Sequence, residues 1–183
     1  MHPPSVIEGP GFSLRPFRTE DAPALSAAIE ESRPQLQRWQ GIADKDGTVP
    51  LVTARIAQWA AAFEDRSRLQ YGLIAPDDMV LGACALEHID GRARTFQLGY
   101  WLCPSATGQG HMTAAVRLLT RMAFEALAAR RVAIWTDVGN TRSVAVARRL
   151  GFTLEGHLRN ERLDAAGNPQ DTFVFARTSA LGL

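Results

Sequence analysis

The sequence has little cysteine and almost no lysine. Its 183 residues include two cysteines, Cys84 and Cys103, which is too few for a disulfide framework. Both lie in apolar, strand-like stretches, where cysteine packs as a small hydrophobic residue. Lys45 is the only lysine among 20 basic residues, a bias that reflects base composition rather than function. The cysteine usage fits a reducing cytoplasm.

A long hydrophobic run is also absent. No stretch approaches the roughly 18 apolar residues that a membrane span needs. Residues 1–11 contain several prolines and lack the apolar region of a signal peptide, so they predict a flexible N-terminal tail. We therefore expect a mature cytoplasmic protein without a membrane partner.

Strong net charge is the third absence. The chain carries 20 basic and 19 acidic residues, a balance of +1 that excludes a global attraction to nucleic acid or to anionic membranes. The charge is nevertheless uneven, because residues 1–91 carry 8 basic and 13 acidic groups and residues 92–183 carry 12 and 6. Either a compact anion binds to the second half, or the fold interleaves the halves and the asymmetry means nothing.

With 46% apolar and 21% charged residues, the chain has enough hydrophobic material for the core of one soluble domain, residues 1–183. Residues 12–18 alternate as a strand, and residues 19–31 begin with a helix cap. The order that follows predicts an α+β fold with a mixed central sheet. We expect a helical turn (34–39), a polar loop (43–50), a helix (51–68), a strand meander (69–75, 80–89, 95–103), a helix (110–129), a strand (131–137), a helix (141–150) and two strands (152–163, 172–178).

The loop between the third meander strand and the long helix predicts an anion site. Gly108 and Gly110 let the backbone approach a ligand, and the helix start directs free N–H groups at one point, which suits a phosphate. A dinucleotide fingerprint is disfavoured, because Thr113 replaces its third glycine and Asp137 lies too far along the chain for its acidic partner.

At this point the chain resembles the GNAT superfamily of N-acetyltransferases, and within it the group of ribosomal-protein N-terminal acetyltransferases. The matching pieces occur in order over nearly the whole chain: LRP at 14–16, LQRW at 36–39, LGYWL at 98–102, the loop at 108–113, Asn140 with Ser143, and LGF-x-LEG at 150–156.

The resemblance implies a mostly antiparallel sheet of about seven strands, flanked by helices, in which a splayed strand pair holds acetyl-CoA. Acetyl-CoA would be the cosubstrate, and no metal is implied. The residues implied to bind acetyl-CoA are Leu102, Thr107, Gly108, Gln109, Gly110, His111, Met112, Thr113, Asn140 and Ser143. Further candidates for its phosphates are Arg117, Arg142 and Arg148.

The resemblance also implies catalytic roles. Many members place a tyrosine where this chain has Ala147, so Ser143 is the expected donor of a proton to the thiolate, with a structural helix-start role as the alternative. A glutamate common in relatives is replaced by Gln97, which cannot accept a proton but can orient a water or an amine. Candidates for the base or for positioning the amine are therefore Glu87, Gln97 and Glu161, with His88, Glu155 and His157 also open.

Trp39 and Tyr100 are the expected acceptor-binding residues, whereas Trp59 is expected in the core. A site without a strong base suits an α-amine, with a pKa of about 7.7–8.0, better than a lysine at about 10.4. The expected function is therefore acetylation of a protein or peptide N-terminus by direct attack on the thioester. The alternatives are acetylation of a small amine (polyamine, aminoglycoside-like antibiotic or aminoacyl nucleotide) and a non-catalytic CoA sensor, in each case as a monomer or a homodimer.

Overall fold

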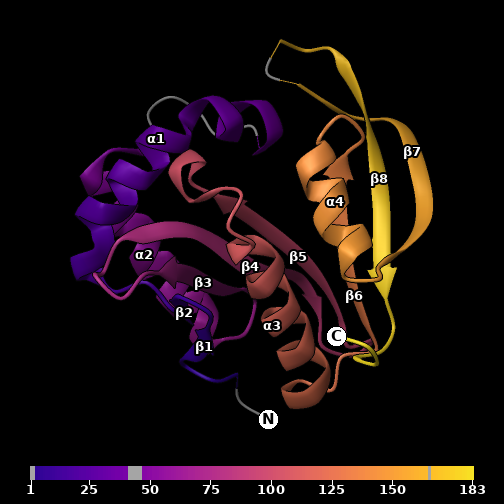
Figure 1. Cartoon of the computed structure of the whole chain (residues 1–183), viewed down its shortest axis with the longest axis horizontal. Helices are drawn as coiled ribbons and strands as arrows, with labels where there is room; N and C mark the ends of the chain where they lie inside the picture. Colours follow the sequence, from indigo (N-terminus) through magenta and orange to yellow (C-terminus); the bar gives the residue numbers. More distant parts are fainter. Residues whose placement is uncertain (1–2, 41–46, 165) are drawn as a thin grey trace.

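One eight-stranded sheet, in the order β1-β2-β3-β4-β5-β6-β8-β7, organises the chain (Figure 1). The computed structural model describes residues 3–40, 47–164 and 166–183. Its elements are β1 (Ile7–Gly9), β2 (Phe12–Arg15), a 3-10 turn (Thr19–Asp21), α1 (Ala22–Gln40), α2 (Val49–Glu64), β3 (Leu69–Ile74), β4 (Val80–Asp90), β5 (Thr95–Leu102), a 3-10 turn (Pro104–Ala106), α3 (His111–Ala126), β6 (Arg131–Asp137), α4 (Thr141–Arg149), β7 (Thr153–Leu163) and β8 (Pro169–Arg177).

The predicted order of elements is confirmed, and the structure adds a strand at the N-terminus. The flexible tail expected over residues 1–11 is wrong at Ile7–Gly9, which pairs antiparallel with β2 as β1. The Tyr71 hydroxyl also donates a hydrogen bond to the Pro4 carbonyl at 2.9 Å. Three residues are too few for an alternating pattern to predict a strand. Ile7–Gly9 becomes a strand because it pairs with β2.

Helix α1 corrects a second expectation. The sequence predicts a helix that stops near residue 31 and a separate turn at 34–39, yet α1 runs without interruption through Pro34. Proline removes one backbone hydrogen bond from a helix interior. Ser32 and Leu36, on either side of Pro34, are fully buried, so their packing compensates for the missing hydrogen bond. The polar loop expected over 43–50 lies partly outside the described residues, and Val49 and Pro50 already belong to α2.

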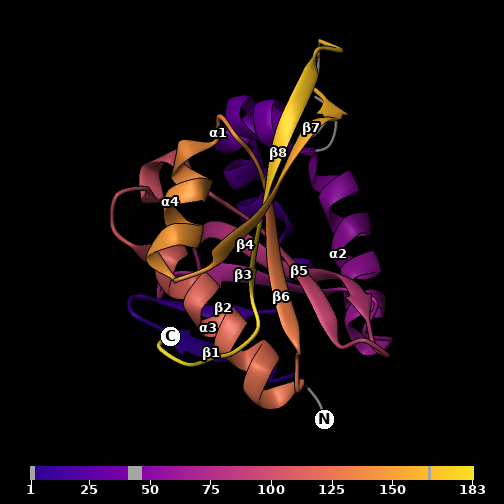
Figure 2. The same ribbon diagram turned by 90° about the vertical axis from the view of Figure 1, so that its right-hand side faces the viewer.

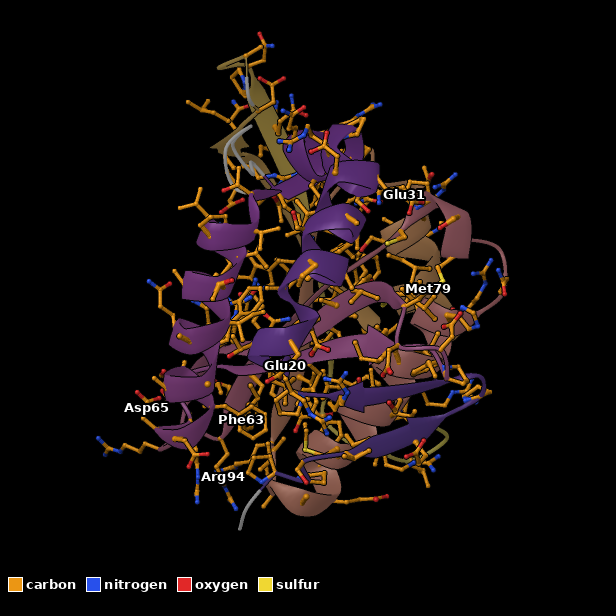
Figure 3. All side chains as sticks on the ribbon, turned by 90° about the vertical axis from the view of Figure 1, so that its left-hand side faces the viewer. Glu20, Glu31, Phe63, Asp65, Met79 and Arg94 are labelled. Carbon is orange, nitrogen blue, oxygen red and sulfur yellow. The ribbon has the colours of Figure 1, made fainter. Side chains whose placement is uncertain are left out.

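Helices cover both faces of the sheet and create two separate cores. Adjacent strand residues alternate between the cores, as Leu73 packs in the one beneath α3 and α4, and Ile74 in the one beneath α1 and α2. Figure 2 shows α3 and α4 on one side of the sheet and α2 on the other. Figure 3 faces α1 and α2, with Phe63 near the C-terminal end of α2.

The centre of the sheet contains a parallel strand pair that separates. β5 and β6 are parallel, but they pair only between residues 95–97 and 131–133. Beyond this point β5 continues to Leu102 and β6 to Asp137 without mutual pairing, and the strands diverge (Figure 1). The predicted splayed pair is thus present, and it opens the sheet between α1, α3 and α4.

A buried ion pair fixes the start of α1. Arg15 donates to both carboxylate oxygens of Asp21, at 2.6 and 2.9 Å, and Asp21 also accepts the Arg18 backbone N–H at 2.7 Å. Both charged side chains are about 10% exposed. Burial alone would raise the pKa of Asp21, but the hydrogen bonds from Arg15 and Arg18 outweigh it and lower the pKa below its usual value.

Candidate active site

The loop before α3 forms an exposed cradle of backbone amides. Gly108 and Gly110 have φ of +83° and +81°, and an added Cβ at either would meet no atom within 4 Å. The positive φ favours glycine, and the open space lets a ligand reach the backbone. Because Gly110 caps α3, its carbonyl accepts the N–H of Ala114, and the first-turn amides point toward the loop. This geometry suits a phosphate or pyrophosphate.

A cleft of about 1370 Å³ adjoins this cradle. It is lined by the end of α1, the end of β5, the loop, the start of α3 and the start of α4. Nine of the ten expected cofactor residues lie on its wall: Leu102, Thr107, Gly108, Gly110, His111, Met112, Thr113, Asn140 and Ser143. Gln109, between the two glycines, is exposed and is not among the lining residues.

Arginine side chains give this cleft a positive charge. Arg117 and Arg142 line it as expected, whereas Arg148 lines a separate shallow pocket with Phe173. Arg38 and Arg149, which the sequence did not single out, take part in its wall. Within the described parts of the chain, no carboxylate lines the cleft. The electrostatics favour an anionic ligand such as a nucleotide phosphate.

Asn140 and Ser143 begin α4 at the wider end of the splay. The Asn140 side-chain oxygen accepts the Ser143 N–H at 3.2 Å and caps the helix. The Tyr100 hydroxyl, on β5, lies 2.9 Å from Ser143 Oγ and 3.3 Å from the Ser143 carbonyl. Burial raises the pKa of Tyr100 to about 12, so it is a neutral phenol near pH 7.

A second cavity, of about 510 Å³, lies against the same pair of strands. Its other walls come from α1, α2, β3, β4, β5, β6 and β7. The residues that it shares with the larger cleft are Leu36, Trp39, Gln40, Tyr100, Trp101, Asn140 and Ser143. The two hollows therefore meet where β5 and β6 have parted. A ligand in the charged cleft can expose its reactive end to a second molecule in this cavity.

Glu87 and Gln97, two of the expected catalytic residues, line the second cavity. They lie opposite each other in the antiparallel register of β4 and β5. A carboxylate oxygen of Glu87 lies 2.6 Å from an Arg68 guanidinium nitrogen, and Arg68 also donates to Gln70. A Cβ at residue 99 would lie 2.8 Å from Glu87 Oε1, so Gly99 leaves the space that this carboxylate occupies.

The other expected bases lie away from both hollows. Glu161 accepts a hydrogen bond from Thr172 at 2.8 Å, Glu155 pairs with Arg131 at 2.6 Å, and His157 contacts Asp171 at 2.7 Å. His88 is exposed at an irregular part of β4. None of these side chains lines the cleft or the second cavity. Among the expected bases, Glu87 is thus the one that lines the second cavity.

The sequence missed an ion pair in the second cavity. Asp137, at the end of β6, is 5% exposed and accepts hydrogen bonds from Arg162 and from the Gly139 N–H, each at 2.7 Å. Arg162 also donates to the Trp39 carbonyl at 3.1 Å. The pair ties the β7–β8 hairpin to the end of α1 and to the loop before α4. No local pattern marks Arg162, because its partners are distant in the sequence.

All four tryptophans of the chain line the second cavity: Trp39, Trp59, Trp101 and Trp135. Trp39 was an expected acceptor residue. Trp59 combines its expected packing, against Phe17 at 5.6 Å between ring centroids, with a place on the cavity wall. Trp101 and Trp135 come from the two strands that separate.

A basic cleft with an amide cradle, joined through a parted strand pair to a second cavity, is the arrangement of an enzyme that passes a group from a nucleotide-bearing donor to an acceptor. Comparison with known proteins gives the class. The profile of the family described as "Acetyltransferase (GNAT) domain" matches residues 12–153, and the chain belongs to this family. It is therefore an acetyl-CoA-dependent N-acetyltransferase of the GNAT type.

Individual relatives of the chain also have names that describe N-acetyltransferases. The "Putative ribosomal N-acetyltransferase YdaF" of Bacillus subtilis (strain 168) is 32% identical over 150 residues, which are 81% of this chain and 81% of that protein. The "Ribosomal-protein-serine acetyltransferase" of Escherichia coli (strain K12) is 31% identical over 107 residues, 58% of this chain and 60% of that protein. The structure of Mycobacterium smegmatis RimJ in complex with CoA-disulfide is similar, with a TM-score of 0.88 and 26% identity over 100% of this chain and 93% of that chain.

Across the described ranges, none of the helices is both long enough and apolar enough to cross a membrane.

Proposed function

We propose that this enzyme acetylates the N-terminal α-amine of a protein or peptide in the cytoplasm. The observation that carries the proposal is the junction of the two hollows at Tyr100 and Ser143. The cleft holds the CoA portion of acetyl-CoA, with its phosphates at the loop of Gly108 and Gly110, and the acceptor enters from the other side. The names of the relatives, which mention ribosomal proteins, support a protein acceptor.

In the proposed reaction, a neutral amine attacks the thioester carbonyl, so that a C–N bond forms and the C–S bond breaks. The amine loses one proton and the departing thiolate gains one. Ser143 Oγ gives the departing thiolate its proton and regains one from solvent after the products leave. The hydrogen bond between the Tyr100 and Ser143 hydroxyls can be donated by either group, and in this step Tyr100 is the donor, so that the serine hydrogen can turn toward the sulfur.

Glu87 is the proposed acceptor of the amine proton, and Gln97 beside it orients the amine or a relaying water. The Arg68 guanidinium holds the Glu87 carboxylate in place at 2.6 Å. An α-amine has an ordinary pKa of about 7.7–8.0 and is partly neutral at physiological pH, so a carboxylate suffices as its base. A lysine side chain, at about 10.4, would require a stronger base than this cavity provides.

The test is release of CoA thiol together with mass spectrometry of a mixed pool of amines. The pool contains peptides with varied N-termini, a lysine peptide with a blocked N-terminus, spermidine and an aminoglycoside. We expect acetyl groups on peptide N-termini in step with thiol release. Acetylation of the lysine peptide or of the small amines alone would overturn the proposed acceptor.

A matched pair of variants tests the base. Glu87→Gln removes a carboxylate that lines the cavity and pairs with an arginine at 2.6 Å, and it should lower kcat by about 100-fold. Glu155→Gln removes a carboxylate that also pairs with an arginine at 2.6 Å but lies outside both hollows, so it should leave kcat unchanged. Equal activity of the two variants would exclude Glu87 as the base.

A further inference from the structure

The distribution of tryptophan suggests what the second cavity prefers to bind. The four indoles reach it from four different elements, α1, α2, β5 and β6. Trp59 and Trp101 also pack against the core beneath α1 and α2, where they remain only partly buried. None of the four is fully buried, and Trp135 is 43% exposed. Partly exposed indoles that converge on one hollow offer flat apolar surface to a ligand.

The charged groups of the same cavity argue against a polycationic ligand. The described lining contains three arginines, Arg55, Arg68 and Arg162, and two carboxylates. Each carboxylate is paired with one of these arginines, since Glu87 contacts Arg68 at 2.6 Å and Asp137 contacts Arg162 at 2.7 Å. A second positive charge on the acceptor would therefore find both carboxylates already paired with arginine.

The size of the cavity limits the ligand further. At about 510 Å³ it falls in the range of hollows that enclose a drug-sized molecule. It can therefore surround an amine and one or two side chains, whereas the rest of a longer acceptor must lie outside.

We infer that the second cavity selects an amine that carries an aromatic ring close to the amine group and no second positive charge. This inference rests on the proposed function, which places the acceptor in this cavity. For a peptide acceptor, the ring belongs to one of the first two residues. Polyamines and peptides with a basic residue next to the N-terminus are disfavoured.

The test compares three otherwise identical, lysine-free peptides that begin Ser-Phe, Ser-Leu and Ser-Arg. Tyramine and spermidine serve as small-molecule counterparts. Two quantities are measured for each: kcat/KM with acetyl-CoA, and the dissociation constant from protein saturated with CoA, by isothermal titration calorimetry. We expect the Ser-Phe peptide to have a kcat/KM about three- to tenfold higher than Ser-Leu and a dissociation constant about three- to tenfold lower, because an aromatic pair adds about 0.5–1.5 kcal/mol beyond the burial of apolar area. Ser-Arg should be at least about tenfold weaker than Ser-Leu.

Variants link the preference to the indoles. Trp135→Leu should lower the Phe-to-Leu ratio although three indoles remain, whereas Trp135→Phe should keep most of it, because a ring is retained at this position. Leu154→Ala is the matched control, since Leu154 is similarly exposed, at 45%, on another strand of the sheet and lines neither hollow. It should leave the ratio unchanged. Thermal unfolding of each variant checks that the fold persists.

The two readouts separate the failure of this inference from the failure of the proposed function. Acetylation of all peptides without a Phe-to-Leu preference, or a preference that Trp135→Leu leaves unchanged, overturns the inference and leaves the function intact. A binding preference without acetyl transfer supports the inference and overturns the function. Equal acetylation of tyramine and of the Ser-Phe peptide would show that a small aromatic amine is a sufficient acceptor. Acetylation of the peptide alone would show that the acceptor must be a peptide.

Discussion

The Tyr100 hydroxyl lies 2.9 Å from Ser143 Oγ, and this contact joins β5 to the start of α4 across the gap between the parted strands. Burial raises the pKa of Tyr100 to about 12, so the phenol keeps its proton near pH 7. That proton can go to the Ser143 carbonyl at 3.3 Å or to Ser143 Oγ, and either hydroxyl can be the donor in the contact between them. The orientation of the serine hydroxyl is therefore coupled to that of the tyrosine.

Ser143→Ala should lower kcat by about 100-fold and leave the KM for acetyl-CoA nearly unchanged, because it removes the proposed proton donor. Tyr100→Phe should lower kcat by about tenfold, since it removes one hydrogen bond but keeps the ring. Steady-state thiol release measures both. The serine is not the donor if Ser143→Ala retains wild-type kcat. A Tyr100→Phe effect that persists in the Ser143→Ala background would show that the tyrosine acts by another route.

Gly110→Ala should weaken acetyl-CoA binding. A residue with a Cβ at φ of +81° costs about 1–2 kcal/mol, and relief of that strain would move the amide cradle. We expect a raised KM for acetyl-CoA and a smaller rise in melting temperature when CoA is added. Gly167→Ala is the control, because Gly167 has φ of +84° and equally open surroundings in the β7–β8 hairpin. It should lose similar stability and keep the wild-type KM.

Asp21→Asn should destabilise the fold by about 3 kcal/mol at neutral pH, because it removes the buried partner of Arg15 and leaves only Asp78, which is 90% exposed and 4.0 Å away. The pKa of Asp21 is lowered in the folded state, so its contribution is complete above the ordinary pKa of about 3.9 and disappears as pH falls through the folded value. Urea unfolding of wild type and variant as a function of pH measures this. The two curves should converge in acid, and a constant separation down to the lowest pH would exclude the ion pair as the cause.

The two cysteines should not react with a disulfide reagent in the native enzyme. Both are buried, and burial raises the pKa of Cys103 to about 11 and raises the pKa of Cys84 as well. Labelling should appear only when urea unfolds the chain, with two thiols released together. Rapid labelling of one thiol in the native protein would contradict the buried placement. The slow reaction also means that thiol release assays report CoA without a protein background.

The sequence predicts those parts of the molecule that local chemistry determines. The Gly108–Gly110 loop and the alternation of β3 to β5 carry their own signals, and the structure has them where expected. The helix end predicted before Pro34 is wrong, because the burial of Leu36 and Ser32 outweighs the local tendency of proline to end a helix. The Asp137–Arg162 pair and the convergence of the four tryptophans on the second cavity could not be predicted. These residues come together only after β6, β7 and the helices have packed around the open sheet.

Because every indole of the chain borders the second cavity, the intrinsic fluorescence of the enzyme comes from the walls of this cavity. Trp39 and Trp101 also line the larger cleft, so emission should respond to a ligand in either hollow, without a label or an engineered probe. The same property changes how a fluorescence-detected melting curve should be interpreted. Such a curve follows the loss of structure around the two hollows, and circular dichroism is needed to follow the sheet itself.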